Sequence, residues 1–166
     1  MAAGAAVAVV AGDAMTTADI APLTSPSRDV LFVYGTLRPS LIDRALAEAP
    51  RELITRVRLV GPATVPGLLF DLGAYPGFVH HEPRDACDQE TPAVVVGDLI
   101  EVTTDQLAVL DAYEECGGPS PLYRRERIQA RQQNGSERDC WIYVYARNTS
   151  AAALIPSGNY ARHLAR

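Results

Sequence analysis

The sequence has few of the features that mark membrane-spanning, secreted or nucleic-acid-binding proteins. No apolar run approaches the roughly 20 residues that a membrane-spanning helix requires. The three cysteines, Cys87, Cys116 and Cys140, are odd in number and widely spaced, so they suggest neither a disulfide framework nor a paired metal site. Positive charge is in deficit, and the net charge is -5. These absences disfavour nucleic acid and anionic membranes as partners and indicate a reducing cytoplasm.

What is present fits one globular domain. The chain has 166 residues, of which 48% are hydrophobic and 21% charged, enough for a packed core. Ala2–Ala11 has the apolar character of a signal-peptide core, but no basic segment precedes it. We therefore interpret residues 1–28 as a flexible N-terminal tail and residues 29–166 as a single domain. The composition leaves the oligomeric state open.

Hydrophobic periodicity predicts more strands than helices. Strands are expected at residues 30–33, 53–60, 68–72, 78–81, 93–102, 123–130 and 140–146. Helices are expected from Ser40 to about Pro50 and from Thr104 to Glu115, with Thr103 or Thr104 as a cap. Asn134-Gly135 is typical of the hairpin turn between two antiparallel strands. We predict an α+β fold, with a small mixed, curved β-sheet or closed β-barrel and flanking helices.

Three other patterns are interpreted as structural. The aromatic residues at alternate positions of 141–145 share one face and indicate packing of the barrel wall. His80 and His81 lie beside an acidic segment, but neighbouring residues of a strand point in opposite directions, and no ligand spacing supports a metal site. The segment Glu82–Pro92 has no periodicity and is interpreted as a surface loop.

The first candidate site lies where a buried strand ends. Val30–Val33 is followed by a turn, Tyr34-Gly35-Thr36-Leu37, and then by Pro39 and Ser40. A strand that enters a glycine turn before a helix directs backbone N–H groups outward, which suits a small anion or an oxyanion. Gly35 would allow unusual φ and ψ angles and close approach of another molecule. An ordinary strand-to-helix turn is the alternative.

The second candidate is a carboxylate on the apolar face of a helix. Leu107, Leu110 and Glu114 are related by steps of three and four, whereas Glu115 points toward the expected solvent side. Burial would raise the pKa of Glu114 toward neutrality, as a general base requires. Alternatively, the helix end frays and Glu114 reaches water. Periodicity alone does not decide between the two.

Taken together, these segments resemble the gamma-glutamylcyclotransferase family of AIG2-like proteins. The resemblance rests on VLFVYGTLRPS (30–40), GLLFDLGAYPG (67–77), VGDLIEV (96–102), LDAYEECGGPSPLYRRERI (110–128) and IPSGNY (155–160), in this order. It implies a cofactor-independent enzyme that releases 5-oxoproline from a small γ-glutamyl substrate by intramolecular aminolysis. The expected catalytic acid/base is Glu114, and the expected substrate-binding residues are Tyr34, Gly35, Thr36, Leu37 and Tyr123. No metal is implied.

The sequence departs from the family pattern in places. Glu115 stands where a glycine is common, Asn159-Tyr160 replaces the usual Asp-Trp, and the acidic loop Glu82–Pro92 looks longer than usual. The second carboxylate could alter the titration of Glu114 or simply face solvent. These differences keep an alternative open, in which the fold retains a small-molecule pocket and acts as a non-catalytic binding or regulatory protein.

Overall fold

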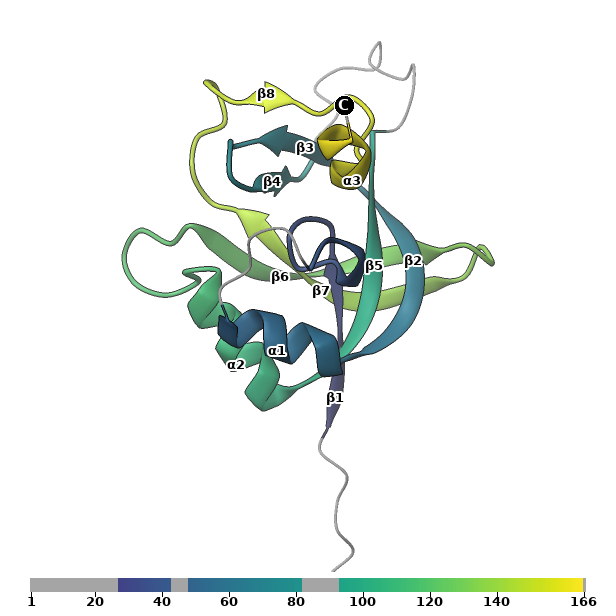
Figure 1. Ribbon diagram of the computed structural model, residues 1–166. Coiled ribbons are helices and arrows are strands. Elements are labelled where there is room, and N and C mark those ends of the chain that lie inside the picture. The colour runs from purple at the N-terminus through teal and green to yellow at the C-terminus, as the bar shows by residue number, and fades with distance from the viewer. Residues whose placement is uncertain (1–26, 43–47, 82–92, 166) are drawn as a thin grey trace, which may run out of the picture.

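Five strands form a closed barrel in the order β1–β5–β2–β6–β7, and three shorter strands form a second sheet in the order β4–β3–β8 (Figure 1). The structure is a computed structural model that describes residues 27–42, 48–81 and 93–165. The strands are β1 (Arg28–Val33), β2 (Arg58–Pro66), β3 (Leu68–Asp71), β4 (Pro76–Val79), β5 (Val94–Thr103), β6 (Tyr123–Gln132), β7 (Glu137–Tyr145) and β8 (Ala153–Leu154). The helices are η1 (Pro39–Leu41, a 3₁₀ turn), α1 (Glu48–Arg56), α2 (Thr104–Tyr113) and α3 (Tyr160–Leu164).

Strand β1 closes the barrel. It pairs antiparallel with β5 and parallel with β7, where Leu31 lies opposite Trp141. Strands β6 and β7 form the hairpin that the Asn134-Gly135 pattern predicts, and Gly135 has a φ of 83° in its turn. Glycine adopts this left-handed conformation without the steric cost that a side chain brings. The predicted α+β fold with a closed barrel is therefore confirmed.

Successive residues of β1 are buried on opposite faces of the barrel wall. Phe32 packs with Leu99 and Ile142 in a core that continues under the small sheet. Leu31 and its neighbours pack instead against α1 and α2, through Ile54, Leu107 and Leu110. Because both faces are covered, the strand reads as a continuous apolar run rather than an alternating one. This double burial fixes the position of the turn that follows Val33.

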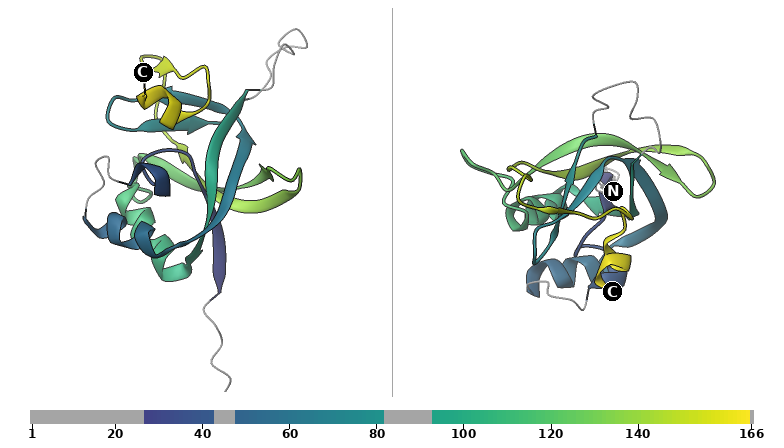
Figure 2. Two further views of the ribbon diagram at one scale, coloured as in Figure 1. Left: turned by 45° about the vertical axis from the view of Figure 1, so that its right-hand side comes forward. Right: turned by 90° about the horizontal axis from the view of Figure 1, so that it is seen from above.

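The helices and the small sheet lie at different places around the barrel. Figure 2 (left) shows α1 and α2 beside the lower half of the barrel, and the small sheet with α3 above it. Thr103 caps α2, since its hydroxyl accepts from Gln106 N–H while the Gln106 side chain accepts from Thr103 N–H. Among the described residues, no helix is long and apolar enough to cross a membrane.

Two predicted boundaries are wrong. The first helix was expected to end near Pro50, yet α1 continues to Arg56. A strand was expected from Leu53 to Val60, yet only the last three of these residues, Arg58–Val60, belong to a strand, as the start of β2. Pro50 lies in the first turn of α1, where its missing N–H costs no helical hydrogen bond. One helical face, with Leu53, Ile54 and Val57, then packs in the core that also contains Leu107 and Leu110 of α2. Leu53 and Val57 are an even number of positions apart, so their spacing also fits the alternation of a strand.

The C-terminal segment contains two elements that periodicity did not predict. Strand β8 has only two residues, and it pairs with β3 through Ala153 and Leu154. Helix α3 is five residues long and is capped by Asn159, whose side chain accepts from Arg162 N–H. Elements this short carry too few residues for a periodic signal. The predicted acidic loop Glu82–Pro92 lies outside the described residues, as does most of the predicted tail.

Candidate active site

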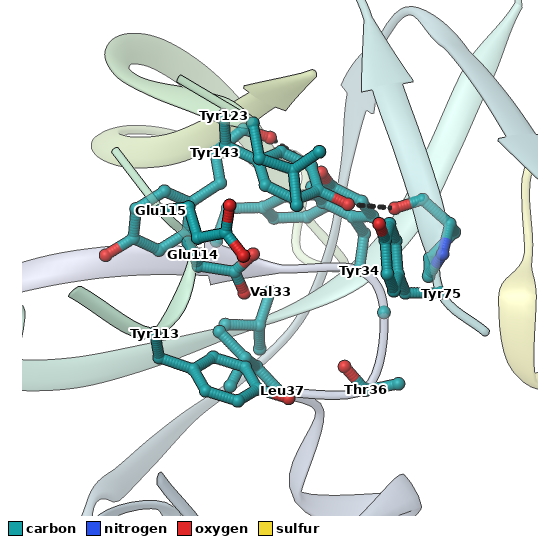
Figure 3. Close-up of a pocket in the computed structure, with 14 residues that line it drawn as sticks. Val33, Tyr34, Thr36, Leu37, Tyr75, Tyr113, Glu114, Glu115, Tyr123 and Tyr143 are labelled. Carbon is teal, nitrogen blue, oxygen red and sulfur yellow. Dashed lines mark hydrogen bonds between the residues drawn. The ribbon is translucent and has the colours of Figure 1, made fainter. Parts of the chain in front are cut away.

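A pocket of about 230 Å³ opens beside the end of β1, between the turn that follows it and the end of α2 (Figure 3). It is small compared with the roughly 300–1,000 Å³ of drug-sized ligand sites, so it suits a compact metabolite. The lining residues are Phe32, Val33, Tyr34, Gly35, Thr36, Leu37, Tyr75, Pro76, Tyr113, Glu114, Glu115, Leu122, Tyr123 and Tyr143. All six residues expected at the site from the sequence are among them. The structure therefore brings together two segments that lie about eighty positions apart in the chain.

The turn after β1 is held by hydrogen bonds to the surrounding barrel. Tyr34 is buried, and its hydroxyl donates to Tyr143 O at 2.6 Å and accepts from Phe78 N–H at 3.3 Å. Arg38 N–H donates to Gly35 O at 3.0 Å, which closes the four-residue turn. The position of Thr36 and Leu37 at the pocket wall is thus set by both β7 and the small sheet.

A buried ion pair fastens the same turn to β5. The Arg38 guanidinium donates to the Asp98 carboxylate, with Nε at 2.8 Å from Oδ2 and Nη2 at 3.3 Å from Oδ1. Both side chains are nearly inaccessible to solvent. Asp98 lies opposite Val33 in the β1–β5 register, so the pair joins the two strands at the level where the turn begins. The sequence analysis did not single out either residue, because a pair 60 positions apart leaves no local pattern.

Gly35 is required for a different reason from the one expected. Its φ is not positive, so the backbone does not use the left-handed conformation that glycine would allow here. Instead, a Cβ built on Gly35 would lie 2.7 Å from Pro76 Cγ, well inside van der Waals contact. The glycine therefore allows the turn to pack against the β3–β4 hairpin.

The opposite wall is the end of α2, which two strands hold in place. The Asp111 carboxylate accepts from Arg125 Nη1 of β6 at 2.8 Å and from the Tyr143 hydroxyl of β7 at 2.9 Å. Glu114 follows one turn later as the C-cap, and its N–H donates to Leu110 O at 2.8 Å. Asp111 and Leu110 thus determine where the Glu114 side chain lies.

Glu114 is half-buried at the pocket, and burial raises its pKa to about 8. The cause is desolvation, which disfavours the charged form of a carboxyl group. Burial also raises the pKa of Tyr34, and the charge of Glu114 raises it further. The same two causes act on Tyr113. Glu114 therefore lies close to tyrosines of both pocket walls, and it does not extend freely into solvent.

Glu115 adopts a left-handed conformation with a φ of 51°, and it is the only described residue other than glycine with a positive φ. Its N–H donates to Ala112 O at 3.3 Å, and Cys116 N–H donates to Asp111 O at 2.9 Å. These two bonds form a Schellman motif, in which glycine usually occupies the left-handed position. The Glu115 side chain is exposed, as expected, but it also lines the pocket.

Tyr123 lines the pocket while its hydroxyl is used within the protein. It donates to Pro76 O at 2.8 Å, so the tyrosine connects β6 to the β3–β4 hairpin. Tyr143 packs in the barrel wall, as the aromatic row predicted, and also reaches the pocket. The sequence analysis did not identify Tyr75, Tyr113 and Tyr143 as pocket residues. They lie in a predicted turn, a predicted helix and a predicted strand, and no local pattern connects these three elements.

The remaining candidates lie away from the pocket. His80 Nε2 lies 2.9 Å from Glu126 Oε2, and the described residues include no group of three His, Cys, Asp or Glu side chains that could hold a metal ion. Burial raises the pKa of the Cys116 thiol to about 12, which leaves it unreactive at neutral pH. Asn159 caps α3 and Tyr160 is its first residue, and neither lines the pocket. Cys87 lies outside the described residues.

The fold and the pocket define a small α+β barrel protein with a strand–turn wall facing a half-buried glutamate. The chain belongs to the gamma-glutamyl cyclotransferase, AIG2-like family, whose model matches residues 31–162. It is 31% identical over 138 residues to a curated Vibrio cholerae protein described as a candidate gamma-glutamylcyclotransferase, covering 81% of this chain and 97% of that protein. The resemblance seen in the sequence is thereby confirmed.

Solved structures support the same fold. An AIG2-like protein from Mus musculus superposes with a TM-score of 0.55 at 20% identity, over 75% of this chain and 81% of that one. YkqA from Bacillus subtilis superposes with a TM-score of 0.59 at 21% identity and covers 82% of this chain. The match spans only 41% of YkqA, so this chain corresponds to less than half of that protein.

Proposed function

We propose that this protein is a gamma-glutamylcyclotransferase that converts a small γ-glutamyl amide into 5-oxoproline and a free amine. The observation that carries the proposal is the half-buried Glu114, whose pKa of about 8 lies near neutrality, facing the Tyr34–Leu37 turn across a small pocket. Family membership supports cyclotransferase-type activity.

The reaction needs little chemical equipment, because nucleophile and electrophile belong to one molecule. The α-nitrogen of the γ-glutamyl group attacks its own γ-carbonyl carbon, and a five-membered ring closes. Holding the substrate in the folded-back conformation supplies much of the rate enhancement. A pocket of about 230 Å³ is compatible with selecting such a compact conformer over extended ones.

Glu114 would move the protons. The lone pair of the neutral α-amine attacks, and the Glu114 carboxylate takes one proton from this nitrogen as the new C–N bond forms, which leaves the ring nitrogen as an amide N–H. Glu114 then gives a proton to the leaving nitrogen as the old C–N bond breaks, so it ends as it began. No water, metal or redox partner is consumed. A pKa near the working pH suits both halves of this role, and such assistance is typically worth about 10²–10⁴-fold.

The turn after β1 would bind the charged part of the substrate. We propose that the backbone N–H groups of Gly35, Thr36 and Leu37 bind either the α-carboxylate of the substrate or the oxyanion that develops on its γ-carbonyl oxygen. Support comes from the position of these residues at the pocket wall and from the hydrogen bonds and ion pair that hold the turn rigid. Rigid donors need no reorganisation as charge develops. Tyr123 would position Pro76 and the hairpin that closes the pocket.

The test is to incubate the protein with γ-glutamyl amides and measure 5-oxoproline. Glu114→Gln keeps the size of the side chain but removes the proton acceptor, so we expect kcat to fall by about 10²–10⁴-fold with the fold retained. Glu137→Gln is a matched control, because Glu137 is exposed at the far end of β7 from the pocket. Its activity should equal that of the wild type.

Two results would count against the proposal. Equal activity of Glu114→Gln and wild type would reject the role of Glu114. Binding of γ-glutamyl amides without any cyclised product would reject turnover and favour a binding protein on the same fold.

A further inference from the structure

The pocket carries negative charge and no positive charge. Among its lining residues the only carboxylates are Glu114 and Glu115, and none is Lys, Arg or His. A γ-glutamyl substrate brings its own α-carboxylate, which any candidate substrate shares. What differs between candidate substrates is the group beyond the scissile amide. The charge of the wall that faces this group therefore bears directly on substrate choice.

Burial separates the two carboxylates into different roles. Glu114 is half-buried, and desolvation is the cause of its raised pKa. Glu115 is exposed at the same pocket, so its side chain is in contact with solvent. Figure 3 shows both side chains extending from the end of α2. Glu114 thus faces the enclosed part of the pocket, while Glu115 stands where the pocket meets solvent.

The backbone at Glu115 is strained, and the strain lies at the pocket. A left-handed residue with a side chain is unfavourable, and the Schellman position normally carries glycine. The bond from Leu122 N–H to Glu115 O, at 3.1 Å, further fixes this residue against the start of β6. An unfavourable conformation that persists at a ligand pocket points to a functional side chain.

An aromatic side chain lies across the pocket from this carboxylate. Tyr75 is 36% exposed although it lines the pocket, and its ring packs edge-on against Tyr123 at 6.3 Å between centroids. Figure 3 shows Tyr75 on the opposite side of the pocket from Glu115. Tyrosine rings attract cations through their faces, and a carboxylate attracts them directly. The mouth of the pocket, where it meets solvent, therefore combines a carboxylate and an aromatic ring, and both favour a positively charged group.

We propose that Glu115 is a specificity-determining residue that selects leaving groups with a positive charge, such as a diamine acylated on one nitrogen, over leaving groups that end in a carboxylate. This inference rests on the proposed function, since it names the substrate class of that same reaction. The free ammonium of the diamine would lie beside Glu115 at the mouth, while the acylated nitrogen lies next to Glu114. Glu115 takes no part in the proton transfers.

Three matched probes test the inference. The γ-glutamyl amides of 1,4-diaminobutane, butylamine and 4-aminobutanoate have leaving groups of similar length, and these carry positive, zero and negative charge at the far end. We expect wild-type kcat/KM to fall in that order. Glu115→Gln keeps the size and backbone position but removes the charge. An exposed ion pair contributes a factor of roughly 1.5 to 5, so the ratio between cationic and anionic probes should fall by roughly 2- to 25-fold.

Salt provides a readout that a merely structural role would not move. Raising the ionic strength screens exposed charges, so the wild-type ratio between cationic and anionic probes should shrink toward that of Glu115→Gln. The variant ratio should change little. Glu137→Gln, which removes an exposed carboxylate far from the pocket, should keep both the wild-type ratio and its salt dependence.

Calorimetric binding of the same probes separates this inference from the proposed function. If cationic probes bind more tightly through Glu115 but yield no 5-oxoproline, the charge selection holds and the cyclisation is rejected. If all three probes are cyclised with a ratio that Glu115→Gln leaves unchanged, the inference is overturned while the function stands. If no probe binds, both are overturned.

Discussion

The two walls of the pocket are built in opposite ways. The turn after β1 is fully tied into the barrel, through the Tyr34 hydroxyl and through the buried pair of Arg38 with Asp98. The end of α2 carries the unfavourable features, a desolvated carboxyl group at Glu114 and a left-handed backbone at Glu115. The first wall pairs its buried charges, although Arg38 Nη1 is buried there without a hydrogen-bond partner among the described residues. The second wall keeps a carboxyl group buried with no opposite charge beside it and a left-handed residue that carries a side chain.

This difference is consistent with the proposed roles of the two walls, substrate binding by the first and proton transfer by the second. A wall that binds a charged substrate group works best when its donors are held rigidly before binding. A wall that transfers protons needs a carboxyl group whose pKa is shifted away from its ordinary value, and such a shift requires burial without a compensating cation. The second wall therefore breaks the local rules of sequence, with a carboxylate on an apolar helix face and a left-handed residue other than glycine, a pattern that is common at functional sites.

The largest loss of stability is expected from removing the buried ion pair between Arg38 and Asp98, which holds the first wall. Asp98→Asn leaves the Arg38 guanidinium buried beside a neutral partner, and removing one member of a buried pair typically costs about 3–5 kcal/mol. We expect the free energy of unfolding to fall by that amount in chemical denaturation. Where the variant remains folded, KM should rise, because the turn loses its connection to β5.

A control isolates the buried pair from the loss of charge alone. Asp139→Asn removes one negative charge from an exposed position of β7, so its stability should lie within about 0.5 kcal/mol of the wild type. If Asp98→Asn were equally stable, the ion pair would not be what holds the first wall.

A smaller loss of stability is expected when a side chain at position 35 displaces the turn after β1 from the β3–β4 hairpin. Gly35→Ala places a methyl group 2.7 Å from Pro76 Cγ, and overpacking of this kind costs about 1–3 kcal/mol. Gly117→Ala is the matched control, since a Cβ there meets no heavy atom within 4 Å and Gly117 has no positive φ. Thermal unfolding compares the two. Equal melting temperatures would show that the turn and the hairpin are not packed tightly.

Sequence reasoning identified both walls, because each leaves a local pattern. The β-branched run of Val30–Val33 stops at a glycine, and Glu114 falls on the stripe of Leu107 and Leu110. Such signals reflect the period of a single element. They also placed the cap of this helix at Thr103 or Thr104, and the structure shows that it is Thr103.

What the sequence could not supply depends on contacts between distant segments. The reason for Gly35 lies in Pro76, and the partner of Arg38 lies 60 positions away. The strand predicted from Leu53 failed because the spacing of Leu53 and Val57 fits both a strand and a helix, and only packing against α2 decides. The left-handed conformation of Glu115 is invisible in sequence, since its side chain gives no sign of backbone strain.

Burial of Glu114 in the second wall should make the free energy of unfolding depend on pH. The pKa of Glu114 is raised from 4.5 to about 8, so the unfolded chain loses this proton at lower pH than the folded protein. The resulting contribution to stability is fully present below about pH 4.5 and is lost as the pH rises through about 8. Between these limits the free energy of unfolding should fall by up to about 1.4 kcal/mol per pH unit.

Glu114→Gln has no titrating group at this position, so the difference between wild type and variant isolates the effect. Denaturant midpoints measured from pH 5 to pH 8 should converge or cross as the pH rises, with the wild type losing its advantage. Parallel curves over this range would mean that the carboxyl group of Glu114 is solvated.

The smallest expected effect concerns the strained backbone of the same wall. Glu115→Gly should relieve the left-handed conformation, since glycine adopts a φ of 51° without steric cost. Part of this gain is offset because glycine is more flexible in the unfolded chain, so we expect a stabilisation of at most about 1 kcal/mol. Glu115→Gln keeps the strain and should match the wild type in thermal unfolding. If the glycine variant is more stable and has also lost the preference for cationic leaving groups, the protein keeps a less stable backbone because the Glu115 side chain serves substrate selection. A glycine variant no more stable than the wild type would mean that the left-handed residue carries no strain.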